Sequence, residues 1–315
     1  MNWKSRVNSV LGDVAGVKLV RADAPDTART TAPAPAKRTQ PRPAGKRRRP
    51  STPGERRRFF TKVSPDMVRP PSHPELDRLL RRPVFVLSPV RSGSTLLRAV
   101  LGAHPRLHAP HELHIRRLTV QYTTSLSEKS MAALGHNQAD LEHLLWDRVM
   151  HRELTRSGKE FFVDKTPSNA FAYARLATAW PDARFIFLVR HPGSIADSWA
   201  EASAGRRTYD EAVLDALRYM RAVQEARENL SGITVRYEDL TGSPEETTRR
   251  ICDFLDVDWE PTMLQYGSEG VFDKGLGDWK EKILSGQIQP GRELPEASEV
   301  PAPVREIART WGYVS

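Results

Sequence analysis

Apolar and polar positions follow one another in blocks from residue 84 to residue 255, in the order that alternating strands and helices produce. Short, mostly apolar runs of strand length lie at 84–87, 161–163, 184–190 and 233–237. Around them, apolar residues recur three and four positions apart at 96–101, 126–157, 194–199, 213–226 and 244–255. Runs that are apolar throughout are typical of strands covered on both faces. The pattern therefore predicts an α/β fold with a central, mostly parallel sheet and helices on both faces.

The stretch Val84–Leu101, VFVLSPVRSGSTLLRAVL, predicts a strand, an anion-binding loop and a helix. It differs from a Walker A loop, GxxxxGK followed by Ser or Thr, because Ser88 replaces the first glycine and Ser94 replaces the lysine. Arg91 is then the candidate cation. The fold expected is a P-loop-like three-layer domain without ordinary ATPase chemistry. The competing interpretation is a plain turn in which Ser92 or Ser94 caps the helix.

Charge is distributed unevenly along the chain. Residues 1–82 carry 20 Lys and Arg against 7 Asp and Glu, whereas the remainder carries 28 against 32. We expect a basic amphipathic helix at 1–22, a disordered basic linker rich in Pro and Ala at 23–70, and the folded domain at 71–315. Residues 1–58 could contact an anionic membrane surface or serve as a solvated linker. No specific nucleic-acid binding is expected. The excess of positive charge lies in residues 1–82, and no aromatic residues alternate with the charged residues there to stack on bases.

Other features narrow the class of protein. The single cysteine, Cys252, excludes an intrachain disulfide and is expected to be a buried thiol. No apolar run is long enough for a transmembrane segment, so the expected location is the cytoplasm, peripheral to the inner face of the membrane if the tail binds lipid.

Candidate chemistry lies where the predicted strands end. Lys165 follows the second apolar run, and Arg190 follows the third, eight residues before Ser198, so the last two can converge on a phosphate. Glu112 and His111, in the segment HPRLHAPHELHIRRL, are candidates for a general base. The histidines of this segment lack the HExxH spacing of a zinc helix, so no metal site is expected.

These motifs together resemble the sulfotransferases that use 3'-phosphoadenosine 5'-phosphosulfate (PAPS). SPVRSGSTLLR is similar to the family's 5'-phosphosulfate loop, and Arg190 with Ser198 in RHPGSIADS is similar to its 3'-phosphate pair. Tyr237 in VRYEDL corresponds to a tyrosine near the adenosine, and KGLGDWK, residues 274–280, resembles the glycine loop that closes on the nucleotide. The resemblance spans residues 83–280. It makes 71–315 a sulfotransferase domain of bacterial type.

The resemblance implies a division of roles among these residues. The nucleotide would be bound by Arg91, Ser92, Gly93, Ser94, Thr95, Leu96, Arg190, Ser198, Tyr237, Lys274 and Gly275. Arg91 and Lys165 would hold the phosphosulfate bridge, with two anion sites flanking a flat hydrophobic slot. PAPS would be the donor and PAP, its desulfated form, the product, with no metal required.

The catalytic base separates two branches of the family. Cytosolic sulfotransferases carry a histidine two residues after the lysine, where this chain has Pro167, and their dimer motif KxxxTVxxxE is not evident. DKTP and Glu112 look closer to the branch of tyrosylprotein sulfotransferases and polyketide assembly-line domains. In that branch a glutamate at the position of Glu112 takes the acceptor's proton; His111 is the second candidate.

The acceptor is left open by the sequence: a small molecule, a lipid-linked compound or a glycan, bearing a hydroxyl or, less favoured, an amine. Residues 119–159 are expected to shape its pocket. Two other classes also stay open at this point. One is a P-loop kinase or another nucleotide-dependent transferase. The other is a non-catalytic protein that binds membrane or nucleic acid through its basic tail.

Overall fold

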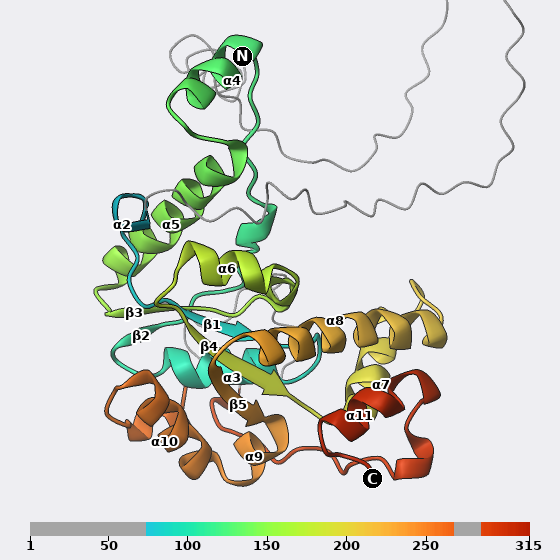
Figure 1. The fold of residues 1–315 in the computed structure, drawn as a ribbon. Helices are drawn as coiled ribbons and strands as arrows, with labels where there is room; N and C mark the ends of the chain where they lie inside the picture. The colour runs from blue at the N-terminus through green and yellow to red at the C-terminus, as the bar shows by residue number, and fades with distance from the viewer. Residues whose placement is uncertain (1–73, 268–284) are drawn as a thin grey trace, which may run out of the picture. The chain divides into compact units, whose positions relative to one another are not determined.

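A parallel five-stranded sheet forms the centre of the protein. The computed structural model describes residues 74–267 and 285–315 (Figure 1). The strands are β1 (Val84–Leu87), β2 (Leu107–His108), β3 (Phe161–Asp164), β4 (Arg184–Val189) and β5 (Gly232–Arg236). Their order is β2-β3-β1-β4-β5, and every pairing is parallel. All carboxyl ends therefore lie at one edge, and β1 occupies the middle.

The strands are connected by helices and 3-10 turns. Their bounds are α2 (Pro74–Asp77), α3 (Ser94–Gly102), η2 (Ile115–Arg117), α4 (Ser125–Ala133), α5 (Gln138–Ser157), η3 (Pro167–Ala172), α6 (Tyr173–Ala179), α7 (Pro192–Ser203), α8 (Tyr209–Asn229), α9 (Tyr237–Gly242), α10 (Pro244–Leu255), η4 (Pro261–Leu264), η6 (Ala297–Glu299), η7 (Ala302–Val304) and α11 (Arg305–Thr310). Residues 121–129 belong to a compact unit separate from 65–120 and 130–315. All five strands belong to the larger unit, 65–120 and 130–315.

Helices cover both faces of the sheet, as the alternating pattern predicts. Val84 and Val86 of β1 join a buried apolar cluster with α3 and α10 on one face. Phe85 and Leu87 point to the other face and pack in a cluster with residues of α5, α6 and α8. In Figure 1, α6 and α10 lie on opposite sides of the strands. The predicted three-layer α/β architecture is confirmed.

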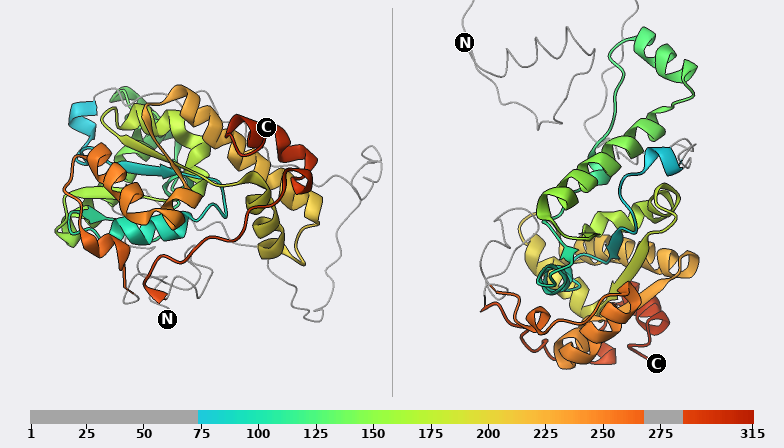
Figure 2. Two further views of the ribbon diagram at one scale, coloured as in Figure 1. Left: turned by 90° about the horizontal axis from the view of Figure 1, so that it is seen from below. Right: turned by 90° about the vertical axis from the view of Figure 1, so that its left-hand side faces the viewer.

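A third apolar cluster joins the helices beyond β4. It combines residues of α7, α8, η7 and α11, including Ile195, Met220 and Trp311. The two views of Figure 2 show α11 beside α7 and α8. Because α7 follows directly from the end of β4, this packing fixes the helix that carries Ser198.

The segment 126–157 differs from its prediction. It forms two helices, α4 and α5, and α5 does not bury the expected stripe of leucines, since Leu141, Leu144 and Leu145 are only half-buried. Its buried face is instead rich in polar side chains: Asp140, Glu142, His143 and Asp147, alongside Ala139, Trp146 and Met150.

These polar groups are buried because distant parts of the chain supply their partners. Arg175 donates from Nε to His143 Nε2 at 2.8 Å and pairs with Glu142 at 2.9 Å. Burial and the nearby Arg175 lower the pKa of His143 to about 3, so this imidazole is neutral. Asp147 accepts hydrogen bonds from the backbone N–H groups of Leu79 and Leu80. The network is structural.

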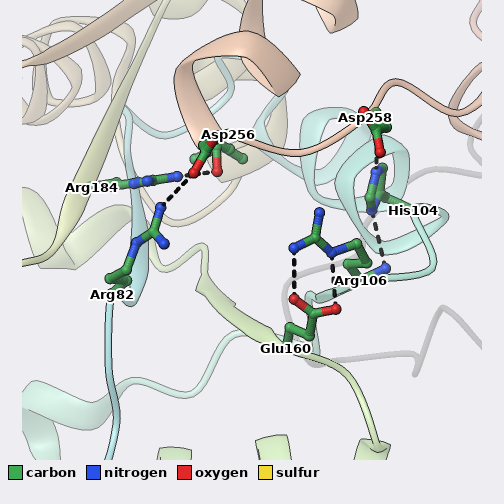
Figure 3. A network of polar contacts seen from close by, with 8 residues as sticks. Arg82, His104, Arg106, Glu160, Arg184, Asp256 and Asp258 are labelled. Carbon is green, nitrogen blue, oxygen red and sulfur yellow. Dashed lines mark hydrogen bonds and ion pairs between the residues drawn. The ribbon is translucent and has the colours of Figure 1, made fainter.

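A second polar network lies at the amino ends of the strands, the edge opposite the predicted site (Figure 3). Arg106 pairs with Glu160, which precedes β3, at 2.7 Å, and Arg82, just before β1, pairs with Asp256 at 3.3 Å. His104 is buried, with its Nε2 2.8 Å from the carbonyl of Asp258 and its Nδ1 accepting from the Arg106 N–H. His104 therefore links α3 to the segment after α10.

Lys159 fixes the carboxyl end of α3. Its ammonium donates to the carbonyls of Gly102, His104 and Leu107 at 2.8–2.9 Å. We expect Lys159→Ala to lower the free energy of unfolding by about 1.5–3 kcal/mol, because these carbonyls lose a charged donor. Chemical denaturation measures this. Arg148→Ala, on the exposed side of α5, is the control and is expected to change stability by less than about 0.5 kcal/mol; equal effects of the two changes would contradict the capping role.

Several sequence predictions concern residues outside the described ranges. They include the amphipathic helix at 1–22, the linker at 23–70, the first residues of the folded domain at 71–73, and the candidate residues Lys274 and Gly275. Within 74–267 and 285–315, no helix combines the length and apolar character needed to cross a membrane. Cys252 is buried as predicted, and burial raises the pKa of its thiol to about 11.

Candidate active site

The loop between β1 and α3 exposes a helix N-terminus without a side-chain cap. Gly93 is the N-cap residue, at φ 86°, and it has no side chain with which to cap the helix. Ser92 does not cap the helix, since its hydroxyl donates to the carbonyl of Pro89 at 2.8 Å, and Ser94 is the first helical residue. N–H groups of the first helical turn lack intrahelical partners and attract anions together with the helix dipole. The geometry thus favours the anion-binding loop over the capped turn.

Gly93 is required by a close approach as well as by its backbone angle. A Cβ built at this position would lie 2.2 Å from Cδ2 of Tyr237. Tyr237 is the first residue of α9 and not, as predicted, the last residue of a strand, so its ring is carried across the loop by the turn that follows β5. Glycine therefore lets an aromatic side chain lie directly on the loop.

The predicted 5' and 3' anion sites adjoin each other. Arg91 donates from Nε to Ser198 Oγ at 3.2 Å, and Arg190 donates to the carbonyl of Arg91 at 3.0 Å. The Arg190 guanidinium also lies over the ring of Tyr237, with Cζ 4.5 Å from the centroid. The residues that the sequence assigns to the two anion sites are therefore in direct contact with each other, and the predicted slot between the sites stays a prediction.

Positive charge is concentrated around Arg91. Its backbone has φ 61°, a left-handed conformation that is costly for a residue with a side chain. Burial lowers the pKa of Arg91, and the neighbouring Arg190 and Arg292 lower it further, against the opposite effect of Glu201. Cations held this close repel one another, so a bound anion would relieve the repulsion.

Glu112 is in direct contact with Lys165. Lys165 is fully buried just after β3, and its Nζ lies 2.5 Å from Glu112 Oε1. The other oxygen, Oε2, is 3.4 Å from Nε2 of His114. His111 is exposed, and unlike Glu112 it does not line the cavity described below. The structure therefore places Glu112, and not His111, at the site.

The loop that carries Glu112 is anchored on two sides. Arg98, buried in α3, donates to the carbonyl of Ala109 at 3.2 Å. On the other side, the N–H of His114 donates to Thr166 Oγ1 at 3.4 Å. The helix of the anion loop and the turn after Lys165 therefore hold Glu112 jointly.

Asp164 organises the turn that follows β3. Its two oxygens accept from Thr166 Oγ1 at 2.9 Å and from Asn169 Nδ2 at 2.7 Å. Burial raises the pKa of this carboxyl. Asp164 does not line the cavity, unlike the Mg-binding aspartate that a P-loop kinase would place after a core strand.

A cavity of about 550 Å³ joins these groups. It is lined by Val90, Arg91, Gly93, Ser94, Thr95, Leu96, Glu112, Pro167, Arg190, Ser198, Trp199, Ala202, Arg206, Arg207, Asp215, Arg218, Tyr219, Tyr237, Tyr266, Gln287, Gln289, Pro290 and Arg292. The predicted residues of the loop, of β4–α7 and of α9 are thus together. Ser92 is buried behind the loop, and Lys165 reaches the site through Glu112.

The sequence predicts that residues 119–159 shape the acceptor pocket. None of residues 130–159 lines this cavity, and which residues contact the acceptor stays a prediction. One wall of the cavity is formed by the end of α7, the following loop and α8, which pack in one apolar cluster with Val189 at the carboxyl end of β4. The sequence analysis did not predict four other arginines that line the cavity: Arg206, Arg207, Arg218 and Arg292. Two of them, Arg206 and Arg207, are adjacent and follow soon after the helix of Ser198, and this was the only sign of them in the sequence.

The histidines after α3 do not form a metal site within the described residues. No group of three or more His, Cys, Asp or Glu residues with the geometry of a metal site occurs in 74–267 and 285–315.

A helix N-terminus after the central strand of a parallel sheet, with cations after the neighbouring strand, is an arrangement with which α/β proteins bind anionic ligands. Comparison with protein-family models identifies the family: residues 83–261 match the model of the sulfotransferase family. This match covers more than half of the chain. The chain therefore belongs to the sulfotransferase family, in agreement with the sequence prediction.

Individual relatives agree with this assignment. A putative protein-tyrosine sulfotransferase of Caenorhabditis briggsae is 27% identical over 199 residues, which cover 58% of this chain and 68% of that protein. Nodulation protein NoeE of Sinorhizobium fredii is 27% identical over 208 residues, covering 55% of this chain and 50% of NoeE. Across the first curated relatives, the match spans 32% to 68% of their length.

A solved structure shares the fold. The sulfotransferase domain of the Synechococcus PCC 7002 olefin synthase is 23% identical, with a TM-score of 0.56. The alignment covers 78% of this chain and 98% of that domain.

Proposed function

We propose that this protein transfers a sulfuryl group from PAPS to a hydroxyl group of an acceptor. The observation that carries the proposal is the convergence of Arg91, Arg190 and Ser198 at the open N-terminus of α3, in one cavity with Glu112. The 3' and 5' positions of a nucleotide belong to one ribose, so anion sites that adjoin each other suit a 3',5'-bisphosphate. A relative named as a protein-tyrosine sulfotransferase supports a hydroxyl as the acceptor group.

The chain's residues divide the proposed reaction between them. The acceptor oxygen forms a bond to sulfur while the bond from sulfur to the 5'-phosphate oxygen breaks, and PAP leaves with that electron pair. Arg91 and the N–H groups at the start of α3 stabilise the charge on the bridging and equatorial oxygens, and the buried Lys165 adds its positive charge from behind Glu112. Glu112 accepts the proton of the acceptor hydroxyl. Glu112 contacts Lys165, so the base is placed beside the group being transferred.

The proposal is tested by titrating the full chain with PAP, AMP and ATP. We expect PAP to bind at least about tenfold more tightly than either, because Arg190 and Ser198 add a charged contact to the 3'-phosphate. Arg190→Ala is expected to remove most of the difference between PAP and AMP. Isothermal calorimetry measures both effects. Preference for ATP would favour a kinase, and an equal loss of PAP and AMP affinity in the variant would contradict the role of Arg190.

A further inference from the structure

The cavity lining carries a net positive charge, and its arginines come from two different parts of the chain. Its arginines are Arg91, Arg190, Arg206, Arg207, Arg218 and Arg292, whereas its carboxylates are Glu112 and Asp215. The proposed donor site uses the arginines near the β1 loop. Arg206, Arg207 and Arg218, here called the arginine wall, lie on the loop between α7 and α8 and on α8. They have no role in binding the nucleotide in the proposed reaction.

Electrostatic contacts divide these arginines into two groups. The pKa of Arg91 is lowered by burial and by Arg190 and Arg292, which are all near the β1 loop. The pKa of Arg116 is lowered by burial, then by Arg117 and also by Arg218. Arg218 therefore lies in the field of Arg116 and Arg117 of η2, whereas Arg190 and Arg292 are the cations that act on Arg91.

A single acid serves the arginine wall among the residues that the structure describes. Asp215 pairs with Arg218 at 3.0 Å and with Arg207 at 3.6 Å, and it also accepts from Trp199 Nε1 at 3.0 Å. Arg206 donates to the carbonyl of Ala202 at 2.9 Å. One carboxylate thus faces several guanidinium groups, which leaves a net positive charge on this wall.

Aromatic rings hold the wall's cations in place. Arg218 lies over the ring of Phe171, 5.1 Å from the centroid, and the ring of Phe171 is in turn 4.7 Å from that of Tyr219. Arg116 approaches Phe171 at 5.6 Å and donates to the carbonyl of Ser168 at 3.2 Å. Contact with the ring holds the Arg218 guanidinium in one orientation at the cavity wall, where the nitrogens that do not face Asp215 can bind an oxyanion.

The wall is accessible and opens into the same space as the proposed base. The side chain of Arg218 is 58% exposed and that of Arg207 is 38% exposed. Both line the cavity together with Glu112 and Pro167. The rest of an acceptor whose hydroxyl reaches Glu112 would therefore lie in the positive electrostatic potential of these arginines.

We propose that the acceptor carries an oxyanionic group, a carboxylate, a phosphate or a sulfate, which Arg206, Arg207 and Arg218 bind while Glu112 takes the hydroxyl proton. This inference rests on the proposed function, because it assigns the space beside the donor to the acceptor. The three arginines outnumber Asp215, so an oxyanion beside them would gain charge attraction and bidentate hydrogen bonds that a neutral acceptor would not.

The test uses phenols that differ only in the group opposite the hydroxyl. The full chain is saturated with PAP, and calorimetry at 0.15 M salt then measures the binding of 4-hydroxyphenylacetate, 4-hydroxybenzylphosphonate, 4-hydroxyphenylethanol and tyramine. We expect the two anions to bind at least about tenfold more tightly than the neutral alcohol, and tyramine to bind most weakly. The ratio of the carboxylate to the phosphonate affinity shows whether the arginine wall prefers a singly charged planar oxyanion or a tetrahedral one.

The variant Arg206→Gln/Arg218→Gln is expected to abolish the preference for the anions and to leave the affinity for PAP unchanged. Arg221→Gln is the matched control, since Arg221 is exposed on the same helix and does not line the cavity. Unchanged PAP binding also shows that each variant is folded.

Three results would overturn the proposal. The first is equal binding of the anions and the neutral alcohol to the PAP-saturated chain, including absence of binding by all of them. The second is a preference for the anions that survives in the double variant. The third is binding of the anions to the PAP-free chain that saturation with PAP abolishes, which would assign the wall to the donor. Failure of the wild type to bind PAP is a different outcome, because it would refute the proposed function itself.

Discussion

Glu112→Gln is expected to lower the rate of sulfuryl transfer by about a hundredfold or more while PAP affinity stays near that of the wild type. Glutamine keeps the shape of the side chain and an oxygen that can accept from Lys165, but it cannot accept the acceptor's proton. Release of PAP from PAPS measures the rate, with 4-hydroxyphenylacetate and 4-hydroxyphenylethanol as acceptors. Calorimetry measures PAP binding.

The comparison variant for this change is His111→Ala. His111 is the second candidate base from the sequence, and it is exposed and outside the cavity lining, so its loss is expected to leave the rate almost unchanged. Since Lys165 is fully buried and pairs with Glu112, thermal melts of both variants separate a loss of stability from a loss of catalysis. A normal rate in Glu112→Gln together with an inactive His111→Ala would show that the base is His111.

Gly93→Ala is expected to lower PAP affinity by about a hundredfold and the free energy of unfolding by about 2–4 kcal/mol. The added methyl group has to adopt φ 86° and would lie 2.2 Å from Tyr237, so the ring or the loop must move away. Either shift changes the positions of the N–H groups at the start of α3. Calorimetry with PAP and chemical denaturation measure the two effects.

Gly135→Ala is the control that isolates the backbone contribution. Gly135 has φ 83°, and a Cβ there would meet nothing within 4 Å. This variant is expected to lose about 1 kcal/mol of stability and to bind PAP normally. Should both alanine variants bind PAP equally well, the close approach of Tyr237 to the loop would have no part in nucleotide binding.

Much of the donor side could be predicted from the sequence because its residues follow apolar runs. Arg91, Lys165 and Arg190 each come shortly after such a run, and parallel strands bring their carboxyl ends to one edge. The order of the apolar runs is therefore enough to place these three residues at the same edge of the sheet. Their individual roles in binding and catalysis stay predictions.

The acceptor side could not be predicted in the same way. Arg218 lies on the polar face of α8, and a helix face that borders a cavity has the same pattern as one that faces bulk water. The polar face of α5 was missed for a related reason. Glu142 and His143 are buried because Arg175, 33 and 32 residues away, bonds to both of them. The local spacing of apolar residues cannot reveal a partner that is so distant in the sequence.

Arg98 ties the two ends of the proposed site together. It belongs to the helix that begins at the anion loop, and it holds the carbonyl of Ala109, three residues before Glu112. A displacement of α3 on anion binding would therefore reach the backbone beside Glu112. Donor and acceptor binding would then be thermodynamically linked: whatever factor donor binding applies to acceptor affinity, acceptor binding would apply to donor affinity. Two-substrate kinetics of this protein are accordingly to be fitted with an interaction factor and not as independent sites.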